Sequence, residues 1–183
     1  MARPAGQDEK SCFPKEPSSA LEKMMTDYGS AVLRTAYFYL GDQHLAEDVS
    51  QEVFIRAYKN WSTFRGDSSV KTWLTRITIN LCKDKLGLKM GLEQPTDPLL
   101  LKKTESYSVE DEAMDRLSRT AILKHVVKLP SQYHEVIYLY YYLDLTTREI
   151  AEATGSSEGT VRGRLHRARE LLGEYLEREG LAL

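Results

Sequence analysis

Residues Thr146–Leu172 read TTREIAEATGSSEGTVRGRLHRARELL, and their pattern determines how the C-terminal part of the chain folds. The first four, Thr146 to Glu149, have the spacing of a capping box. In this motif the threonine hydroxyl and the glutamate carboxylate accept hydrogen bonds from free backbone N–H groups at a helix start. Apolar residues follow at helical spacing. The pattern therefore predicts a short helix from Thr147 to Thr154.

A tight turn and a second helix come next. Gly155 stands at the end of the first helix, where a short turn between helices needs a residue that tolerates positive φ. Ser156 or Ser157 can cap the second helix. The buried stripe of that helix is predicted to be Val161, Leu165, Ala168 and Leu172. Two short helices that cross at such a turn form a helix-turn-helix, a motif that binds DNA.

The second helix of this motif has an outward face that suits DNA. Between Gly159 and Arg169 there are four arginines and no acidic residue. Arginines reach guanine edges or phosphates, and small residues let a helix enter a groove deeply. The predicted outward face consists of Gly159, Thr160, Arg162, Gly163, His166 and Arg167. Arg164 and Arg169 lie more to the side, where we expect phosphates or acids as partners. The alternative is an ordinary solvated basic helix.

Upstream, the hydrophobic pattern predicts three helices, over residues 20–40, 44–60 and 70–86. In the second helix the residues expected to point inward are Leu45, Val49, Val53, Phe54 and Tyr58. In the third, the residues expected to be buried are Val70, Trp73, Leu74, Ile77 and Leu81. Its expected exposed residues are Lys71, Thr72, Thr75, Arg76, Asn80 and Lys83. Because Trp73 falls on the buried stripe, core packing is favoured over base stacking for its ring.

The remaining stretches complete an all-α chain. Residues 1–19, with three prolines, indicate a flexible leader. Residues 87–109 combine glycine, proline and an excess of acids, and indicate a flexible acidic linker. Helical pattern resumes over 110–128 and over 131–143, where we expect the tyrosines to be core and interface aromatics. We therefore predict two small helical domains, 20–86 and 110–178, with the helix-turn-helix in the second.

Composition narrows the possible classes further. The chain has 183 residues and a net charge of −2, so any nucleic-acid surface must be a local basic patch. Cys12 and Cys82 are isolated, which indicates neither a metal site nor a disulfide framework. No apolar run reaches the roughly 18 residues that a membrane span needs, and no signal-peptide core is present. We expect a cytoplasmic protein.

Three segments resemble one known family. His44–Phe54 (HLAEDVSQEVF) is similar to the core-binding helix of bacterial RNA polymerase sigma factors, and Phe64–Asn80 (FRGDSSVKTWLTRITIN) to their minus-ten recognition and melting segment. Leu129–Leu172 resembles their domain for the upstream element. The layout of two domains without further ones points to the extracytoplasmic-function (ECF) group. The resemblance covers most of the chain from Tyr28 to Leu172.

The resemblance implies a protein-binding surface on the second helix. Asp48, Gln51 and Glu52 would contact the clamp helices of the largest polymerase subunit. Those helices are basic in the family, so the acids here have the complementary charge. The alternative for each residue is a solvated helix face.

The resemblance also implies two DNA-binding surfaces. The loop after the second helix would capture a base flipped out of the minus-ten element, which offsets the cost of unstacking it. The loop residues concerned are Phe64, Arg65, Asp67, Ser68 and Ser69. The third helix would line the opened strand with Lys71, Thr72, Arg76, Asn80 and Lys83. The minus-thirty-five element would be contacted in the major groove by Thr160, Arg162, Gly163, His166 and Arg167.

The function implied is that of an initiation factor which gives RNA polymerase its promoter choice and assists DNA opening. Its partners would be core polymerase, promoter DNA and a cognate anti-sigma factor, often membrane-anchored, with no cofactor and no small-molecule substrate. The alternative is a self-sufficient helix-turn-helix regulator, which needs a ligand pocket or dimer interface within residues 20–86. An enzyme is disfavoured, since no His or Lys completes a site with Asp42, Glu47, Asp48 and Glu52.

Overall fold

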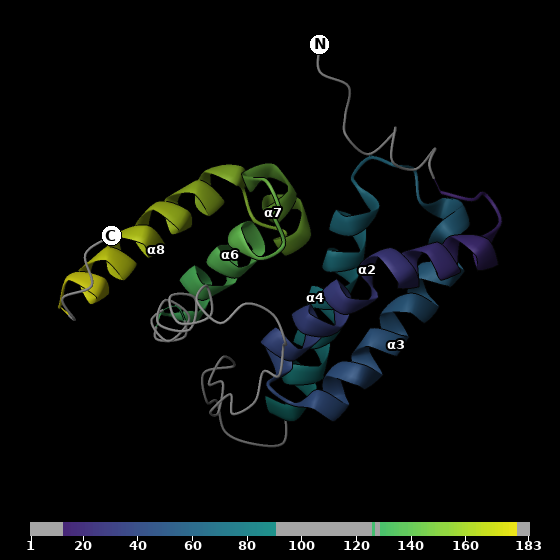
Figure 1. Ribbon diagram of the computed structural model, residues 1–183, viewed down its shortest axis with the longest axis horizontal. Coiled ribbons are helices and arrows are strands. Elements are labelled where there is room, and N and C mark those ends of the chain that lie inside the picture. Colours follow the sequence, from purple (N-terminus) through teal and green to yellow (C-terminus); the bar gives the residue numbers. More distant parts are fainter. Residues whose placement is uncertain (1–12, 91–125, 127–128, 179–183) are drawn as a thin grey trace, which may run out of the picture. The chain divides into compact units, whose positions relative to one another are not determined.

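The computed structural model describes residues 13–90, 126 and 129–178. Every regular element in these ranges is a helix, which confirms the all-α class (Figure 1). The chain divides into two compact units, and the described helices of the N-terminal unit are α2, α3, η1 and α4, those of the C-terminal part α6, α7 and α8. Most of the predicted linker and of the helical pattern over 110–128 lies outside the described residues.

Two long helices and a third packed on both form the N-terminal unit. They are α2 (Pro17–Leu40), α3 (Gln43–Asn60) and α4 (Val70–Met90), with the short 3-10 helix η1 (Trp61–Thr63) after α3. Gly41, at φ 64°, ends α2, and Asp42 caps α3 by accepting a hydrogen bond from the backbone N–H of Leu45 at 3.0 Å. As a result α2 and α3 lie against each other as a helical hairpin (Figure 1).

The helix α2 begins within the stretch of residues 1–19 that we predicted as a flexible leader. The helix begins at Pro17, and the Glu16 carboxylate accepts hydrogen bonds from the N–H groups of Ser18 and Ser19 at 3.1 and 2.8 Å. Phe13 is also buried. A proline at the first helical position lacks only an N–H that has no helical partner there, so Pro17 is compatible with the start of the helix. Residues 13–19 of the predicted leader are therefore part of the folded N-terminal unit.

Threonines occupy part of the core where the prediction placed them outside. Thr72 and Thr75 were expected on the exposed face of α4, yet they are 1% and 6% exposed, and Thr78 is fully buried. The Thr78 hydroxyl donates to the carbonyl of Leu74 at 2.8 Å, so its polar atom needs no partner from another helix. A threonine satisfied in this way packs like a small apolar residue. The predicted exposed face of α4 is correspondingly narrower.

The buried side of α3 is shifted slightly around the helix relative to the prediction. Tyr58 was expected to point inward, but its side chain is 45% exposed. Its place in the core is taken by Ala57, which continues the buried line of Val49 and Val53 at helical spacing. Alanine contributes less to a hydrophobic pattern than tyrosine does, so the pattern favoured Tyr58 over Ala57 as the buried residue.

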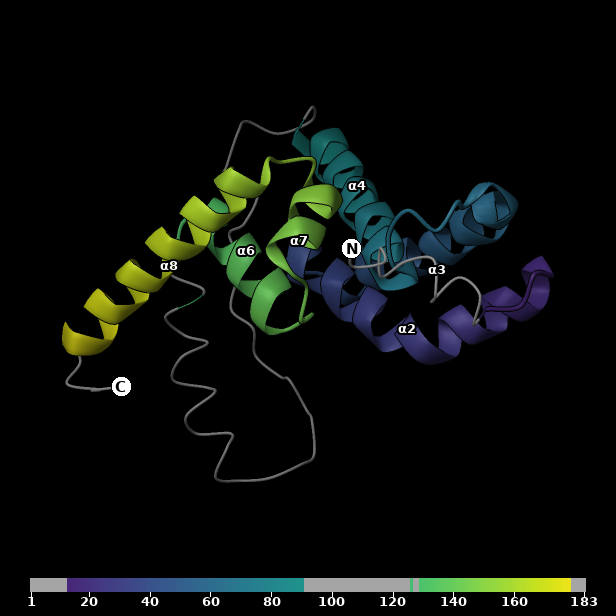
Figure 2. The same ribbon diagram turned by 90° about the horizontal axis from the view of Figure 1, so that it is seen from above.

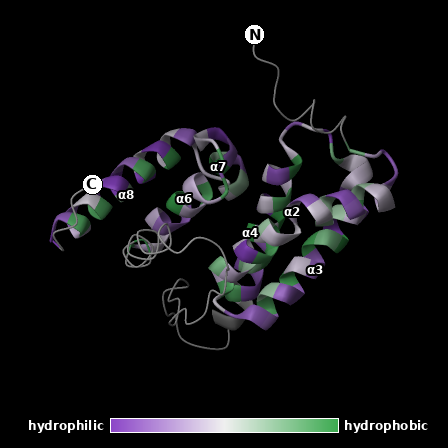
Figure 3. Cartoon of the chain, viewed as in Figure 1, coloured by the Kyte–Doolittle hydropathy of each residue, from purple (hydrophilic) through white to green (hydrophobic). Residues whose placement is uncertain are grey.

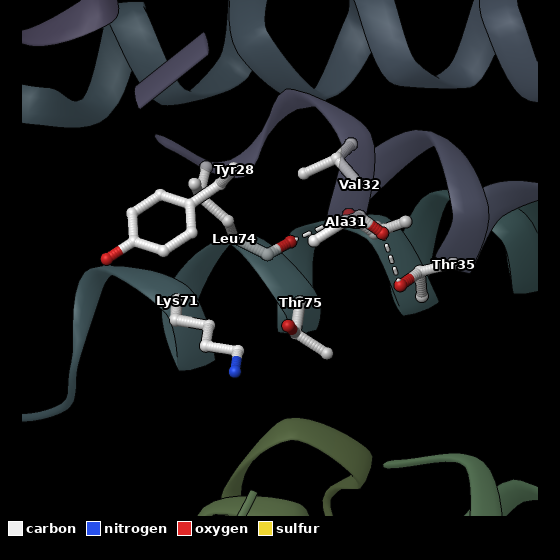
Figure 4. Close-up of a pocket in the computed structure, with 8 residues that line it drawn as sticks. Tyr28, Ala31, Val32, Thr35, Lys71, Leu74 and Thr75 are labelled. Atoms are coloured by element: carbon white, nitrogen blue, oxygen red, sulfur yellow. Dashed lines mark hydrogen bonds between the residues drawn. The ribbon is translucent and has the colours of Figure 1, made fainter. Parts of the chain in front are cut away.

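A small cavity lies between α2 and α4 (Figure 4). Tyr28 and Val32 line it from α2, and Lys71 and Thr75 from α4. Its volume of about 10 Å³ holds roughly one water molecule, whereas pockets for small-molecule ligands are some tens of times larger. This cavity is therefore not the ligand site that a self-sufficient regulator would need.

The described helices of the C-terminal part are α6 (Ser131–Tyr141), α7 (Thr147–Thr154) and α8 (Glu158–Arg178), the last two being the predicted helix-turn-helix (Figure 2). The capping box is present: the Thr146 N–H donates to the Glu149 carboxylate at 2.9 Å, and the Glu149 N–H to the Thr146 hydroxyl at 3.3 Å. Gly155 has φ 68° in the turn, and Ser157, not Ser156, caps α8 through the Thr160 N–H at 3.1 Å.

The two faces of α8 separate by polarity. Val161, Leu165 and Ala168 are buried, as predicted, while α6 packs along the same side. Figure 3 shows α8 alternating between hydrophobic and hydrophilic residues from turn to turn. One side of α8 is thus packed in the core and the other is exposed to solvent.

The role of Gly155 in the turn can be tested by comparing its substitution with that of Gly163, a glycine inside α8. Gly155→Ala should lower the free energy of unfolding by about 1–2 kcal/mol, because an alanine is strained at positive φ even though open space surrounds the added Cβ. Gly163→Ala, inside α8 and also in open space, should instead raise it by about 0.5–1 kcal/mol. Urea denaturation of the two full-length variants measures both effects. Destabilisation of equal size in both variants would contradict the role of the turn.

A buried histidine gives a second prediction. Burial lowers the pKa of His134 to about 4, so the folded state binds its proton less readily than the unfolded state, whose histidine pKa is about 6.5. The contribution of His134 to the free energy of unfolding therefore falls as the pH drops from about 6.5 toward 4, by up to about 1.4 kcal/mol per pH unit. His134→Leu should flatten that dependence relative to the parent in denaturation at pH 7 and pH 5. His44→Gln, an exposed control, should leave it unchanged.

Candidate nucleic-acid interface

The reading face of α8, which we define as Gly159, Thr160, Arg162, Gly163, His166 and Arg167, is exposed at every one of its positions. The capping box, the Gly155 turn and the buried stripe of α8 together orient it. The two glycines leave the backbone uncovered between the cationic side chains, since nothing fills the space around Gly163. The face therefore combines close backbone access with positive charge.

Each cationic side chain of the reading face has an acidic neighbour one turn away. Arg162 Nη2 lies 2.7 Å from Glu158 Oε1, and Arg167 Nη1 lies 3.0 Å from Glu170 Oε2. His166 Nδ1 is 3.7 Å from the same Glu170 carboxylate, a pair that is ionic only when the imidazole is protonated. All of these groups are exposed, so the pairs contribute little to stability and exchange readily for another anion.

Glu158 connects the two helices of the motif. Its Oε1 accepts a hydrogen bond from the Thr147 hydroxyl of α7 at 2.8 Å as well as from Arg162. These hydrogen bonds, that of Thr147 first, lower the pKa of the Glu158 carboxyl. The hydrogen bond that Arg167 donates to the Glu170 carboxylate raises the pKa of Arg167. Glu158 therefore ties the guanidinium of Arg162 to the start of α7.

Within the chain, Arg169 contacts two tyrosines of α6, and its predicted contact with a phosphate stays a prediction. Its Nε donates to the Tyr141 hydroxyl at 3.0 Å, and its guanidinium lies 5.4 and 5.7 Å from the ring centroids of Tyr140 and Tyr141. The prediction did not include these tyrosines, of which Tyr141 lies 28 residues before Arg169 in the sequence. Tyr141 and Tyr142 are themselves about half exposed rather than core residues.

Three aromatic rings fix the loop between η1 and α4, and we call Trp61, Phe64 and Trp73 the aromatic cluster. Phe64 stacks on Trp73 with ring centroids 4.6 Å apart, and on Trp61 at 5.6 Å. Phe64 and Trp61 are buried, while Trp73 is half-buried, so Trp73 packs in the cluster and also reaches the surface. Phe64 is thus a supporting residue of the loop.

The other loop side chains point outward or cap the next helix. Arg65 and Asp67 are exposed and pair at 3.2 Å. Ser69 accepts a hydrogen bond from the Thr72 N–H at 3.0 Å, and its hydroxyl lies 2.8 Å from that of Thr72. The structure therefore gives Ser69 and Thr72 a place in the cap of α4, and burial removes Thr72 from the surface that we predicted for it.

The rest of the predicted α4 surface is exposed. Arg76, Asn80 and Lys83 lie outside the core at intervals of three and four residues, and Lys71 is half-exposed at the start of the helix. Arg76, Asn80 and Lys83 share one exposed, mainly basic side of α4, whereas Lys71 lies toward α2, where it lines the small cavity. Apart from Thr72, the structure places the predicted α4 residues where DNA could reach them.

On α3, Asp48 and Gln51 are exposed, and Glu52 is half-exposed and pairs with Arg56 at 3.0 Å. Two large apolar side chains extend this surface: Ile55 is 46% exposed and Tyr58 is 45% exposed. We had not predicted them as surface residues. The exposed side of α3 is therefore partly acidic and partly apolar.

Among the residues that the structure describes, no group of three or more His, Cys, Asp or Glu is placed to hold a metal ion. None of the helices in the described ranges is long and apolar enough to cross a membrane.

Comparison with known proteins matches both halves of the chain. Residues 24–87 match the model of sigma-70 region 2, and residues 119–172 match that of sigma-70 region 4. The ECF RNA polymerase sigma factor SigW of Bacillus subtilis is 32% identical over 88% of this chain and 91% of its own length. The ECF sigma-E factor of Haemophilus influenzae is 33% identical over 71% and 74% of the two chains.

Solved structures show the same fold. The sigma factor RpoE of Bartonella quintana, in complex with the anti-sigma factor NepR, aligns with a TM-score of 0.70 at 21% identity, covering 85% of this chain and 96% of that one. CnrH, in complex with the cytosolic domain of CnrY, aligns with a TM-score of 0.61 at 22% identity over 94% and 95%.

With both sigma-70 regions in order along one chain and a relative of the ECF group aligned over 91% of its length, the protein belongs to the extracytoplasmic-function group of bacterial RNA polymerase sigma factors.

Proposed function

We propose that this chain gives core RNA polymerase its promoter choice by using three of its surfaces at once. The observation that carries the proposal is that one chain presents both an exposed reading face on α8 and an acidic, partly apolar face on α3. A self-sufficient regulator requires the first surface but not the second. The proposed role is that of a non-catalytic initiation subunit, which acts where polymerase acts, in the cytoplasm.

The α3 surface is the proposed contact with core polymerase. Asp48, Gln51 and Glu52 supply negative and polar groups for the basic clamp helices. Ile55 and Tyr58 add apolar area beside them, which supplies affinity that exposed charges alone do not. This combination of a charged and an apolar part is typical of a protein–protein contact.

The loop and α4 are proposed to open the minus-ten element. Arg65 and Asp67 are exposed and the neighbouring Ser68 is half-exposed, so a flipped base could meet their hydrogen-bonding groups. Arg76, Asn80 and Lys83 then follow the separated strand along α4, with Lys71 at its start. Unstacking a base costs a few kcal/mol, which contacts of this kind offset.

The reading face of α8 is proposed to bind the minus-thirty-five element in the major groove. Arg162 and Arg167 would exchange Glu158 and Glu170 for guanine edges or phosphates, while Thr160, Gly163 and His166 set the fit to the groove. Glu158 holds Arg162 near the helix start before DNA arrives. Arg169, being occupied by Tyr140 and Tyr141, is proposed to support α8 against α6.

Control by an anti-sigma factor is the remaining part of the proposal. The structures to which this fold is similar include sigma factors bound to an anti-sigma factor, as the complex with NepR illustrates. A cognate inhibitor of this chain, whether membrane-anchored or not, would act by covering the polymerase-binding surface or the DNA-binding surfaces. Competition between a candidate inhibitor and core polymerase tests this part.

The first functional prediction concerns polymerase. The double variant Asp48→Lys, Glu52→Lys should weaken binding to core polymerase at least tenfold, because it places cations against a basic partner. Its thermal stability should change little, since both carboxylates are substantially exposed. Titration of labelled protein with core polymerase at physiological salt measures the affinity. Glu22→Lys, an exposed charge reversal on α2, is the control, and equal affinity of both variants would contradict the assignment of α3.

The second functional prediction separates base recognition from charge. Arg162→Ala and Arg167→Ala should each cost about 1–3 kcal/mol of discrimination at one position of the minus-thirty-five element. Arg178→Ala removes the same charge from the far end of α8 and should leave the base preference intact. Holoenzyme binding to single-base promoter variants at several salt concentrations provides the comparison. If Arg162→Ala, Arg167→Ala and Arg178→Ala weaken binding to all sequences alike, α8 contacts only phosphates.

A further inference from the structure

The segment just before α2 is attached to the N-terminal unit by its own set of contacts. Phe13 is only 6% exposed, and its ring lies 5.7 Å from that of Trp61 and 6.4 Å from that of Tyr28. Lys23 Nζ lies 5.2 Å from the centroid of the Phe13 ring, within the range of a cation–π contact. The Trp61 indole N–H donates to the Pro14 carbonyl at 3.0 Å.

Trp61 therefore has two sets of neighbours. On one side it meets Phe13 and Pro14, and on the other it meets Phe64 and Trp73 in the aromatic cluster, with ring centroids at 5.6 and 6.2 Å. Its side chain is only 3% exposed, and Phe13 supplies part of that cover. A change in the packing of Phe13 would consequently affect the loop through the ring of Trp61, which contacts both Phe13 and Phe64.

We propose that Phe13 and Pro14 form a strap which fixes Trp61 and thereby positions the loop from Phe64 to Ser69 for promoter opening. Phe13 is in this sense a positioning residue, and it touches no DNA itself. The inference rests on the proposed function of the loop and names a part of the chain that contributes to it from outside both matched regions, since the region 2 match begins at residue 24.

The physical reason lies in preorganisation. The outward loop side chains Arg65 and Asp67 are highly exposed and pair only with each other among the contacts described above. A loop that is held in one conformation before a base arrives loses less conformational freedom on capturing it. The strap makes the buried side of the loop rigid and leaves its outer side free for the base.

The first arm of the test needs no DNA. Trp61 and Trp73 are the only tryptophans in the chain, so intrinsic fluorescence reports directly on the aromatic cluster. Phe13→Ala should increase acrylamide quenching of the full-length protein, because it uncovers the Trp61 ring. Phe13→Tyr, which keeps a ring, should retain parental quenching, and Phe13→Leu, which keeps apolar volume, should lie between them.

The second arm measures opening by holoenzyme on a promoter fragment that the parental holoenzyme selects from a pool randomised in both elements. The fragment carries 2-aminopurine in the minus-ten element. Phe13→Ala should slow the rise in fluorescence about three- to tenfold, the range that one aromatic pair represents. Affinity for core polymerase and preference in the minus-thirty-five element should stay parental, and Phe13→Tyr should restore the opening rate.

Val49→Ala, a buried truncation in α3, serves as the control for a general loss of stability. It should lower the melting temperature without slowing opening to the same degree. Parental quenching in Phe13→Ala, or increased quenching with a parental opening rate, would overturn the strap. Failure of the parental holoenzyme to open any selected fragment would instead count against the proposed function, so the two failures are distinguishable.

Discussion

Phe64 stacks on Trp73 with ring centroids 4.6 Å apart, and this contact fixes how the chain passes from η1 into α4. Phe64 is buried, while Arg65 and Asp67 after it are exposed and Ser69 caps α4 through the Thr72 N–H. The aromatic cluster therefore anchors the loop from which α4 starts. The surface proposed to open DNA thus depends on a hydrophobic contact none of whose atoms needs to touch DNA.

The helix-turn-helix could be predicted well from short sequence motifs. The helix-turn-helix could be derived from residues no more than a few positions apart: Thr146 and Glu149 satisfy each other's backbone groups, Gly155 takes positive φ, and Ser157 caps the next helix. Such motifs depend on short-range geometry that sequence spacing specifies. For the same reason the exposed positions of the reading face were correctly predicted.

Two kinds of error have physical explanations. Thr72 was placed outside because a hydrophobic pattern counts threonine as polar, although its hydroxyl is satisfied within the cap of its own helix. Other contacts join residues far apart, such as Trp61 with Pro14 across 47 positions and Arg169 with Tyr141 across 28. Periodicity along one segment carries no information about a partner in another, so neither the strap nor the support of Arg169 could be predicted.

The charges on α8 show why such a protein would depend on polymerase for specific binding. Arg162 and Arg167 are already paired with Glu158 and Glu170, so a phosphate or base must replace an acid, and the net electrostatic gain is smaller than four arginines suggest. Under the proposed function, such a face would bind weakly to arbitrary DNA, and correct base contacts would supply the difference in affinity between the promoter and other sequences. Under the proposed function, polymerase joins this face to the opening loop, and the second contact then forms at a high effective concentration. Selectivity at the promoter would then come from two modest contacts made together rather than from one strong contact.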